Sequence, residues 1–146
     1  MPASPGAGGI PASRNAAAVY TRQSDRMPPR CLLVDDNDAF LETASLLLQR
    51  EGLTVVGVAS TIAQALRQAR ALRPDLILVD IGLGDESGFD LAQLLARDDL
   101  NAEVILISTG AEEDYAEMID DSPAAGFLPK SDLSRHGISQ ILGHAS

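Results

Sequence analysis

The chain has 146 residues, a length that suits one domain with a terminal extension. Apolar residues make up 45% of it and aromatic residues only 3%, so the core must be built mainly from Leu, Ile, Val and Ala. No apolar run approaches the roughly 20 residues that a membrane-spanning helix needs, so we expect no membrane partner. The formal net charge of −10 also disfavours a direct nucleic-acid partner, because such binding depends on neutralising phosphates.

The charge is unevenly distributed along the chain. Residues 1–30 hold four Arg and one Asp, whereas residues 31–146 hold seven basic and twenty acidic residues. Residues 1–29 are also rich in Ala, Pro, Gly and Ser and lack apolar periodicity, so we predict a disordered N-terminal tail. Their composition suits an organellar transit peptide as well, and a third interpretation places the start of translation at Met27.

The single cysteine, Cys31, stands at the start of the first apolar run. One cysteine excludes an internal disulfide and is typical of a reducing compartment, so we expect a cytoplasmic protein. We predict that Cys31 is a small buried side chain and not a nucleophile.

Five short apolar runs alternate with segments of helical periodicity. The runs predict strands at residues 31–34, 54–59, 76–79, 104–107 and 126–129. Apolar residues three and four positions apart predict helices over residues 40–48, 62–72, 89–95 and 133–142, the second of them capped by Ser60. A shorter and more polar segment predicts a further helix around residues 112–119.

This alternation predicts an α/β fold. Parallel strands joined by right-handed helical crossovers give a doubly wound five-stranded sheet with helices on both faces. Residues 30–146 are enough for one such domain. The run at residues 76–79 is wholly apolar, as in a strand buried on both faces, and it leads directly into Asp80.

Polar side chains follow four of the five predicted strands. Asp35 and Asp36 follow the first strand, Asp80 the third, Ser108 the fourth and Lys130 the fifth. Because the carboxyl ends of parallel strands meet at one edge of a sheet, we expect these side chains to share one crevice.

Three acids in one crevice repel one another unless a cation lies between them. Mg²⁺ suits such a set of oxygen ligands and keeps waters that phosphate oxygens can replace. A carboxylate held beside Mg²⁺, with Lys and Ser donors nearby, is arranged to attack a phosphoryl group in line. The sequence therefore predicts a Mg²⁺-dependent phosphoryl site.

From residue 30 to about residue 142 the sequence resembles the receiver domain of two-component response regulators. Four motifs at the ends of predicted strands carry the resemblance: LLVDDN with Asp35 and Asp36, LILVDIGLGDESG with Asp80 and Gly88, VILIST with Ser108, and GFLPKSDLS with Phe127 and Lys130. The resemblance implies a flavodoxin-like sheet with strand order 2-1-3-4-5, which the family shares with chemotaxis receivers. The last motif is similar to those of regulators with a helix-turn-helix output.

The resemblance implies a role for each metal-site residue. Asp36, Asp80 and the backbone carbonyl of Gly82 would bind Mg²⁺ directly, and Asp35 would act through a metal-bound water. Asp80 would accept a phosphoryl group from a phosphohistidine on a sensor histidine kinase or a histidine phosphotransfer protein. The domain would be no enzyme beyond phosphorylating and dephosphorylating itself.

The same resemblance implies how the phosphoryl group is sensed. Lys130 would pair with its oxygens, Ser108 would hydrogen-bond one of them, and Phe127 would be the aromatic residue that turns inward on activation. Output would follow from a downstream protein that binds the face formed by the fourth helix, fifth strand and fifth helix. We expect a receiver with no output domain attached.

The sequence departs from the family pattern near the acceptor. Gly84 replaces a frequent Pro, so the loop after Asp80 is expected to be more mobile. Thr109 replaces a usual Ala or Gly, and its branched side chain is expected to crowd the acceptor.

Three alternatives stay open. Asp36-Asn37-Asp38 has the D-x-D spacing of haloacid dehalogenase-type phosphohydrolases, although Phe40 stands where that family has Thr or Val. A receiver-like module that binds partners without phosphorylation is the second. A piece of a longer regulator with a DNA-binding output is the third.

Overall fold

A computed structural model describes residues 29–143 of the chain. The predicted tail lies outside the described residues apart from its last position, and so do the transit-peptide and Met27 interpretations. The strands of the main sheet are β1 (Arg30–Val34), β2 (Thr54–Ala59), β3 (Leu76–Asp80), β6 (Glu103–Ser108) and β7 (Gly126–Pro129). The α-helices are α2 (Asp38–Arg50), α3 (Ile62–Leu72), α4 (Gly88–Arg97), α5 (Ala116–Asp121) and α6 (Arg135–Ile141).

The five strands form one sheet in the order β2-β1-β3-β6-β7, with every neighbouring pair parallel. Numbered among themselves, these strands have the order 2-1-3-4-5, so the predicted flavodoxin-like, doubly wound sheet is confirmed. β3 is central, and all five of its residues are buried. Asp80 is the last residue of β3, paired with Ile107, where the sequence placed it just beyond the strand.

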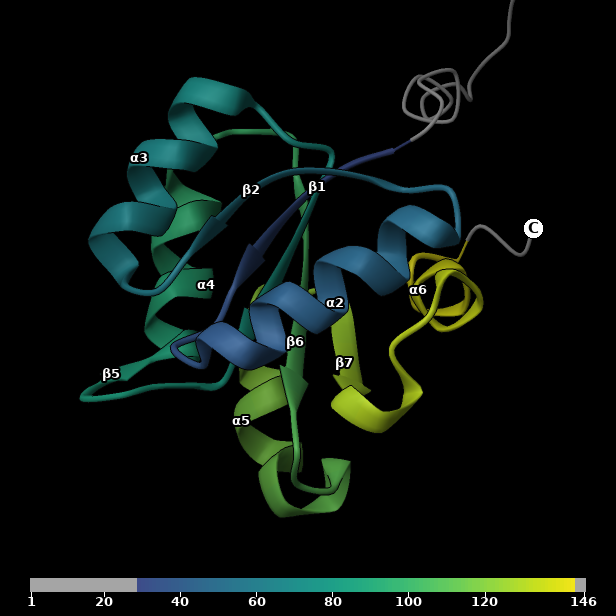
Figure 1. The fold of residues 1–146 in the computed structure, drawn as a ribbon. Coiled ribbons are helices and arrows are strands. Elements are labelled where there is room, and N and C mark those ends of the chain that lie inside the picture. Colours follow the sequence, from purple (N-terminus) through teal and green to yellow (C-terminus); the bar gives the residue numbers. More distant parts are fainter. Residues whose placement is uncertain (1–28, 144–146) are drawn as a thin grey trace, which may run out of the picture.

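Helices cover both faces of the sheet (Figure 1). On one face α2 and α6 pack against a buried cluster that includes Leu33, Leu78 and Ile105. On the other face α3 and α4 pack against a cluster that includes Val79 and Leu106. Alternate residues of each central strand enter opposite clusters, as the pleat of a strand requires.

Side-chain caps fix where the helices begin. Asn37 accepts a hydrogen bond from the Phe40 N–H at the start of α2, at 3.0 Å. Thr61, and not the predicted Ser60, is the N-cap of α3, because its hydroxyl accepts the Gln64 N–H. Such caps satisfy amides that have no partner within the helix.

Three segments differ from the sequence prediction. The helix predicted around residues 112–119 is a 3₁₀ turn, η1 (Glu112–Tyr115), followed by the short α5. The last helix begins at Arg135 and not at residue 133, because the Ser134 hydroxyl caps it by accepting the Gly137 N–H. A second 3₁₀ turn, η2 (Lys130–Asp132), fills the gap after β7.

A small antiparallel hairpin between β3 and α4 was not predicted. It pairs β4 (Gly82–Leu83) with β5 (Glu86–Ser87), and Gly84 in its turn has a φ of 68°. The Glu86 carboxylate accepts a 2.9 Å hydrogen bond from the Ile62 N–H, which ties the hairpin to the first residue of α3. This contact restrains a loop that the sequence predicted to be mobile.

Cys31 has the environment predicted for it. The side chain is fully buried within the α2 and α6 cluster. Burial raises the pKa of its thiol to about 12, so the thiolate that a nucleophile needs is scarcely populated.

Candidate functional site

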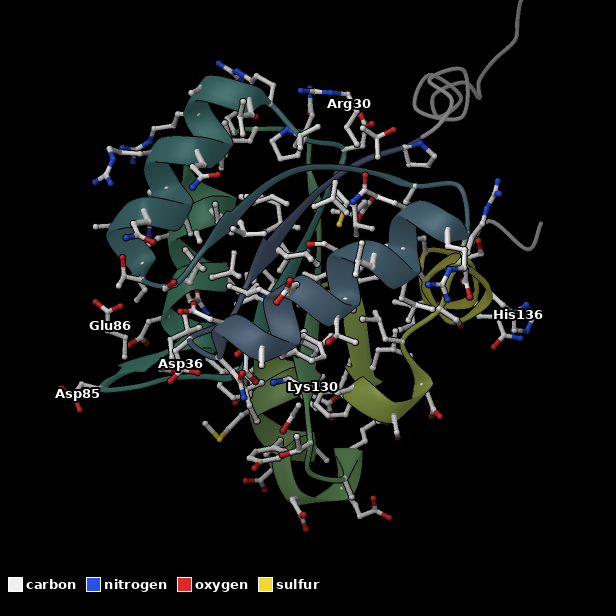
Figure 2. The ribbon with its side chains drawn as sticks, in the orientation of Figure 1. Arg30, Asp36, Asp85, Glu86, Lys130 and His136 are labelled. Carbon is white, nitrogen blue, oxygen red and sulfur yellow. The ribbon has the colours of Figure 1, made fainter. Side chains whose placement is uncertain are left out.

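Four predicted site residues converge at the carboxyl edge of the sheet. Carboxylate oxygens of Asp35, Asp36 and Asp80 all lie within 4.8 Å of one another. Lys130 reaches the same place from η2, directly after β7. In Figure 2 Asp36 and Lys130 lie well away from Arg30, which is at the start of β1 near the top of the view. The parallel register of the sheet thus gathers residues that are 95 positions apart in the chain.

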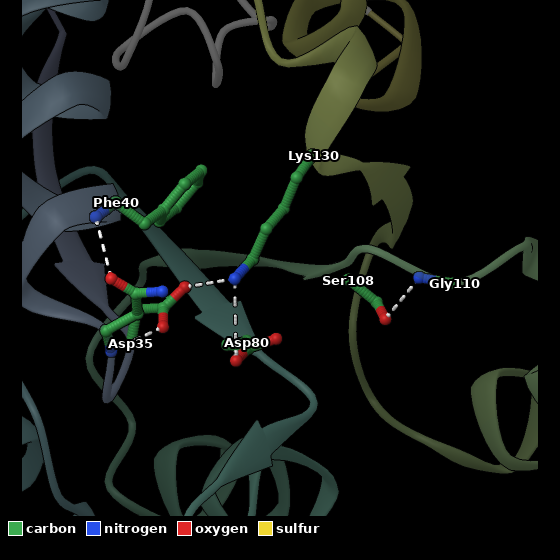
Figure 3. Close-up of polar contacts among 7 residues, drawn as sticks. Asp35, Phe40, Asp80, Ser108, Gly110 and Lys130 are labelled. Atoms are coloured by element: carbon green, nitrogen blue, oxygen red, sulfur yellow. Dashed lines mark hydrogen bonds and ion pairs between the residues drawn. The ribbon is translucent and has the colours of Figure 1, made fainter.

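The Lys130 ammonium lies between two of the carboxylates (Figure 3). Its Nζ is 2.6 Å from Asp35 Oδ2 and 3.7 Å from Asp80 Oδ2. The contact with Asp35 is an ion pair whose geometry is not that of a directional hydrogen bond. The other Asp35 oxygen accepts the Asn37 N–H at 2.9 Å, so the backbone at the start of α2 also holds this carboxylate. Asp35 is 1% exposed and Lys130 14%, so solvent screens the pair weakly.

Asp80 is the carboxylate whose protonation the site changes most. Burial, followed by the negative charge of Asp35, raises the pKa of Asp80 from 3.8 to about 6. The charge of Asp36 adds to this effect, while Lys130 and a backbone hydrogen bond from Gly82 oppose it. The site therefore lacks positive charge, and a bound cation would favour the ionised, nucleophilic form.

The residues present fit Mg²⁺. Three clustered carboxylates are the hard oxygen ligands that this ion prefers. Gly82 lies two residues after Asp80. A Cβ at Gly82 would meet no atom within 4 Å, so space is open beside its backbone. The family expectation that the Gly82 carbonyl joins the acids is compatible with this space.

Ser108 lies at the end of β6 but is turned away from the acids. Its hydroxyl accepts the Gly110 N–H at 3.0 Å, within its own loop (Figure 3). Thr109 is exposed, while Phe127 is 6% exposed and packs in the core with its ring 6.4 Å from that of Tyr115. Phe127, the aromatic residue that the family resemblance implies turns inward on activation, thus already points inward in this structure.

Phe40 is a site residue that the sequence reasoning missed. Its periodic position in α2 was assigned to the core, yet its ring centroid is 4.2 Å from the Lys130 ammonium. No local pattern reveals this contact, because the two residues are 90 positions apart. Asp38, the second acid of the D-x-D spacing, is exposed at the start of α2, and the carboxylate cluster does not include it.

Comparison with known proteins assigns this arrangement to a family. The family model of the response regulator receiver domain matches residues 31–141. The chain belongs to this family. As a receiver domain it is 34% identical over 116 residues to the sensory transduction protein LytT of Enterococcus faecalis, covering 79% of this chain and 47% of LytT. It is also 32% identical over 113 residues to a putative transcriptional regulator of Pseudomonas aeruginosa, covering 77% of this chain and 53% of that protein.

Solved structures agree with this membership. The signal receiver domain of the putative response regulator NarL from Mycobacterium tuberculosis has a TM-score of 0.66 and 30% identity, covering 80% of this chain and 92% of that one. A CheY-like receiver protein from Methanospirillum hungatei has a TM-score of 0.68 at 24% identity, which is a likeness of fold.

The receiver spans about half the length of the curated relatives that it matches. No helix among residues 29–143 is long and apolar enough to cross a membrane.

Proposed function

We propose that this receiver takes a phosphoryl group onto Asp80 from a phosphohistidine of a sensor histidine kinase or a histidine phosphotransfer protein. The observation that carries the proposal is the cluster of Asp35, Asp36 and Asp80 with the Lys130 ammonium in contact with two of them. Three clustered carboxylates repel one another, and the single Lys130 ammonium offsets only part of that repulsion, so the cluster favours a further cation. The unit proposed to act spans residues 30–146, preceded by a dispensable tail.

The reaction is a displacement at phosphorus. An Asp80 carboxylate oxygen forms a bond to phosphorus while the bond to the donor's imidazole nitrogen breaks. The electron pair stays on that nitrogen, which takes up a proton from solvent. Lys130 pairs with the transferred oxygens and offsets the charge that develops on them.

Asp36, Asp80 and the Gly82 carbonyl are the proposed ligands of Mg²⁺, with Asp35 acting through a bound water. The bound ion supplies positive charge against the phosphoryl oxygens. Asp35 also holds Lys130 in place through the 2.6 Å ion pair.

Phosphorylation would then change the contacts of Ser108. Its hydroxyl accepts from Gly110 now, and the phosphoryl group brings roughly −1.5 to −2 charge and three acceptor oxygens. Ser108 would turn to donate its hydroxyl proton to a phosphoryl oxygen, give up the contact with Gly110, and pull the loop after β6 toward Asp80. The altered face of α5, β7 and α6 is the proposed binding site for a downstream protein.

Treatment with acetyl phosphate and Mg²⁺ tests the proposal. Intact-mass measurement is expected to show one added phosphoryl group, about 80 Da, that EDTA prevents and that Asp80→Asn abolishes. Asp90→Asn makes the same carboxylate-to-amide change at an exposed position in the first turn of α4, and this control should keep the label.

A wild-type protein that takes no label would instead favour a receiver that binds partners without phosphorylation. Label that survives Asp80→Asn would show that another residue is the acceptor. Multiple-turnover hydrolysis of phosphate esters would favour the phosphohydrolase alternative.

A further inference from the structure

The Phe40 ring covers one side of the Lys130 ammonium. The distance from Nζ to the ring centroid is 4.2 Å, within the range of a cation–π contact. Phe40 lies in the first turn of α2 and is partly buried, so its ring is shared between the core and the site. Lys130 is thus bounded by Asp35, Asp80 and an aromatic face.

These contacts form a closed circuit of four residues. Asp35 accepts the Asn37 N–H, and the Asn37 side chain accepts the Phe40 N–H. Phe40 then faces Lys130, whose ammonium returns to Asp35. Figure 3 draws the polar links as dashed lines, and it shows the Phe40 ring beside the lysine chain. The N-cap of α2 therefore sets where the ring lies.

We infer that Phe40 is a positioning residue that holds the Lys130 ammonium at the phosphoryl site, an inference that rests on the proposed function of Lys130. The ammonium of a lysine sits on a flexible four-carbon chain, and holding that chain in one conformation without a partner is entropically costly. The ring face attracts the cation and excludes water from one side of it. The ammonium is then already in place when a phosphoryl group arrives, which is how preorganised charge accelerates a reaction.

Core packing is the competing explanation for Phe40, because its ring also contacts the α2 and α6 cluster. Phe40→Leu keeps an apolar side chain there but removes the aromatic face. Phe40→Tyr keeps the face. Phe89→Leu is the matched control, since Phe89 is also partly buried in the first turn of a helix and packs on the opposite face of the sheet.

Two measurements on these variants test the inference. The first is the NMR shift of the Lys130 ε-methylene protons in unphosphorylated protein, which the ring current should move upfield. The second is the initial rate of labelling by acetyl phosphate with Mg²⁺. We expect Phe40→Leu to lose the upfield shift and to label roughly fivefold more slowly, in line with a cation–π contact. Phe40→Tyr should keep the shift and the rate, and Phe89→Leu should change neither.

A wild-type Lys130 shift equal to that of Phe40→Leu would overturn the inference, as would equal labelling rates of the two proteins. Equal slowing by Phe40→Leu and Phe89→Leu would assign the effect to core packing and would also overturn it. If the wild type takes no label at all, the proposed function fails. The NMR shift then still decides whether the ring holds the lysine.

Discussion

Asp80 has opposing demands on its charge. It must be ionised to act as a nucleophile, yet burial and the neighbouring acids favour its protonated form. Lys130 relieves part of this conflict and is itself shared with Asp35 at a shorter distance. A site so arranged stores unfavourable electrostatic energy that a cation releases, which links ion binding to the reactivity of the acceptor.

Removing the Asp80 charge should therefore stabilise the metal-free protein. Its folded pKa of about 6 exceeds the unfolded value of 3.8, so the native state binds more protons between these values. The contribution of Asp80 to stability is fully present below about pH 4 and is lost as the pH rises through about 6. We expect Asp80→Asn to raise the free energy of unfolding by about 1–2 kcal/mol at neutral pH in EDTA.

Urea denaturation of both proteins at acidic and neutral pH measures this effect. The advantage of Asp80→Asn should grow across that interval and shrink when Mg²⁺ is added to the wild type. An equal or lower stability of Asp80→Asn at neutral pH in EDTA would contradict the electrostatic account.

At the scale of elements, the turn from β3 into α4 depends on close backbone approach. Gly88 donates its N–H to the Ile81 carbonyl at 2.9 Å, and a Cβ at Gly88 would overlap the carbonyl oxygen of Asp80. Backbone atoms cannot give way as a flexible side chain can. The glycine therefore allows the acceptor strand and the helix after it to meet.

Gly88→Ala should destabilise the domain by about 3 kcal/mol, at the upper end of overpacking effects. Gly82→Ala is a matched control in the same loop, because its Cβ would meet open space. Thermal unfolding of both variants measures the difference. Similar melting temperatures for the two would contradict this reading of the turn.

The hairpin β4–β5 is held to α3 by one side chain. Glu86 accepts the Ile62 N–H at the positive end of the α3 dipole, whereas Asp85 is exposed in the hairpin turn (Figure 2). We expect Glu86→Ala to speed amide exchange at Ile62 and in the hairpin about fivefold, as for a lost hydrogen bond of about 1 kcal/mol. Glu86→Gln should restore most of the protection.

Asp85→Ala, which removes a neighbouring charge from the same turn, should leave that exchange unchanged. If Asp85→Ala accelerates exchange as much as Glu86→Ala does, general charge and not the Ile62 contact restrains the hairpin.

The elements also show how far sequence reasoning reaches. Short apolar runs located every strand of the main sheet, and helical periodicity located four of the five α-helices. The strand order followed from the family resemblance. The hairpin was missed because two-residue strands are too short to show alternation, although Gly84-Asp85 is a recognised turn pair. The Phe40 contact and the Glu86 tie were missed because both join residues distant in the chain, which no local pattern encodes.

At the scale of the whole molecule, the fold separates two tasks. The carboxyl edge of the sheet gathers the acids and Lys130, and β7 runs toward that edge between the flanking helices α5 and α6 (Figure 1). Lys130 directly follows β7, so a shift of the lysine toward a phosphoryl group would act on the strand of the proposed output face. On the proposed function, phosphorylation at this edge would thereby be coupled to the surface proposed to bind a downstream protein.

The central claim is that Asp80 is the phosphoryl acceptor, and locating the acyl phosphate tests it most directly. Borohydride reduces an aspartyl phosphate to homoserine, so the phosphorylated protein can be reduced, digested and sequenced by mass spectrometry. Our account predicts homoserine at position 80 after treatment with acetyl phosphate and Mg²⁺, and none in EDTA. Homoserine at Asp35 or Asp36 in its place, or a labelled protein without homoserine at position 80, would contradict it.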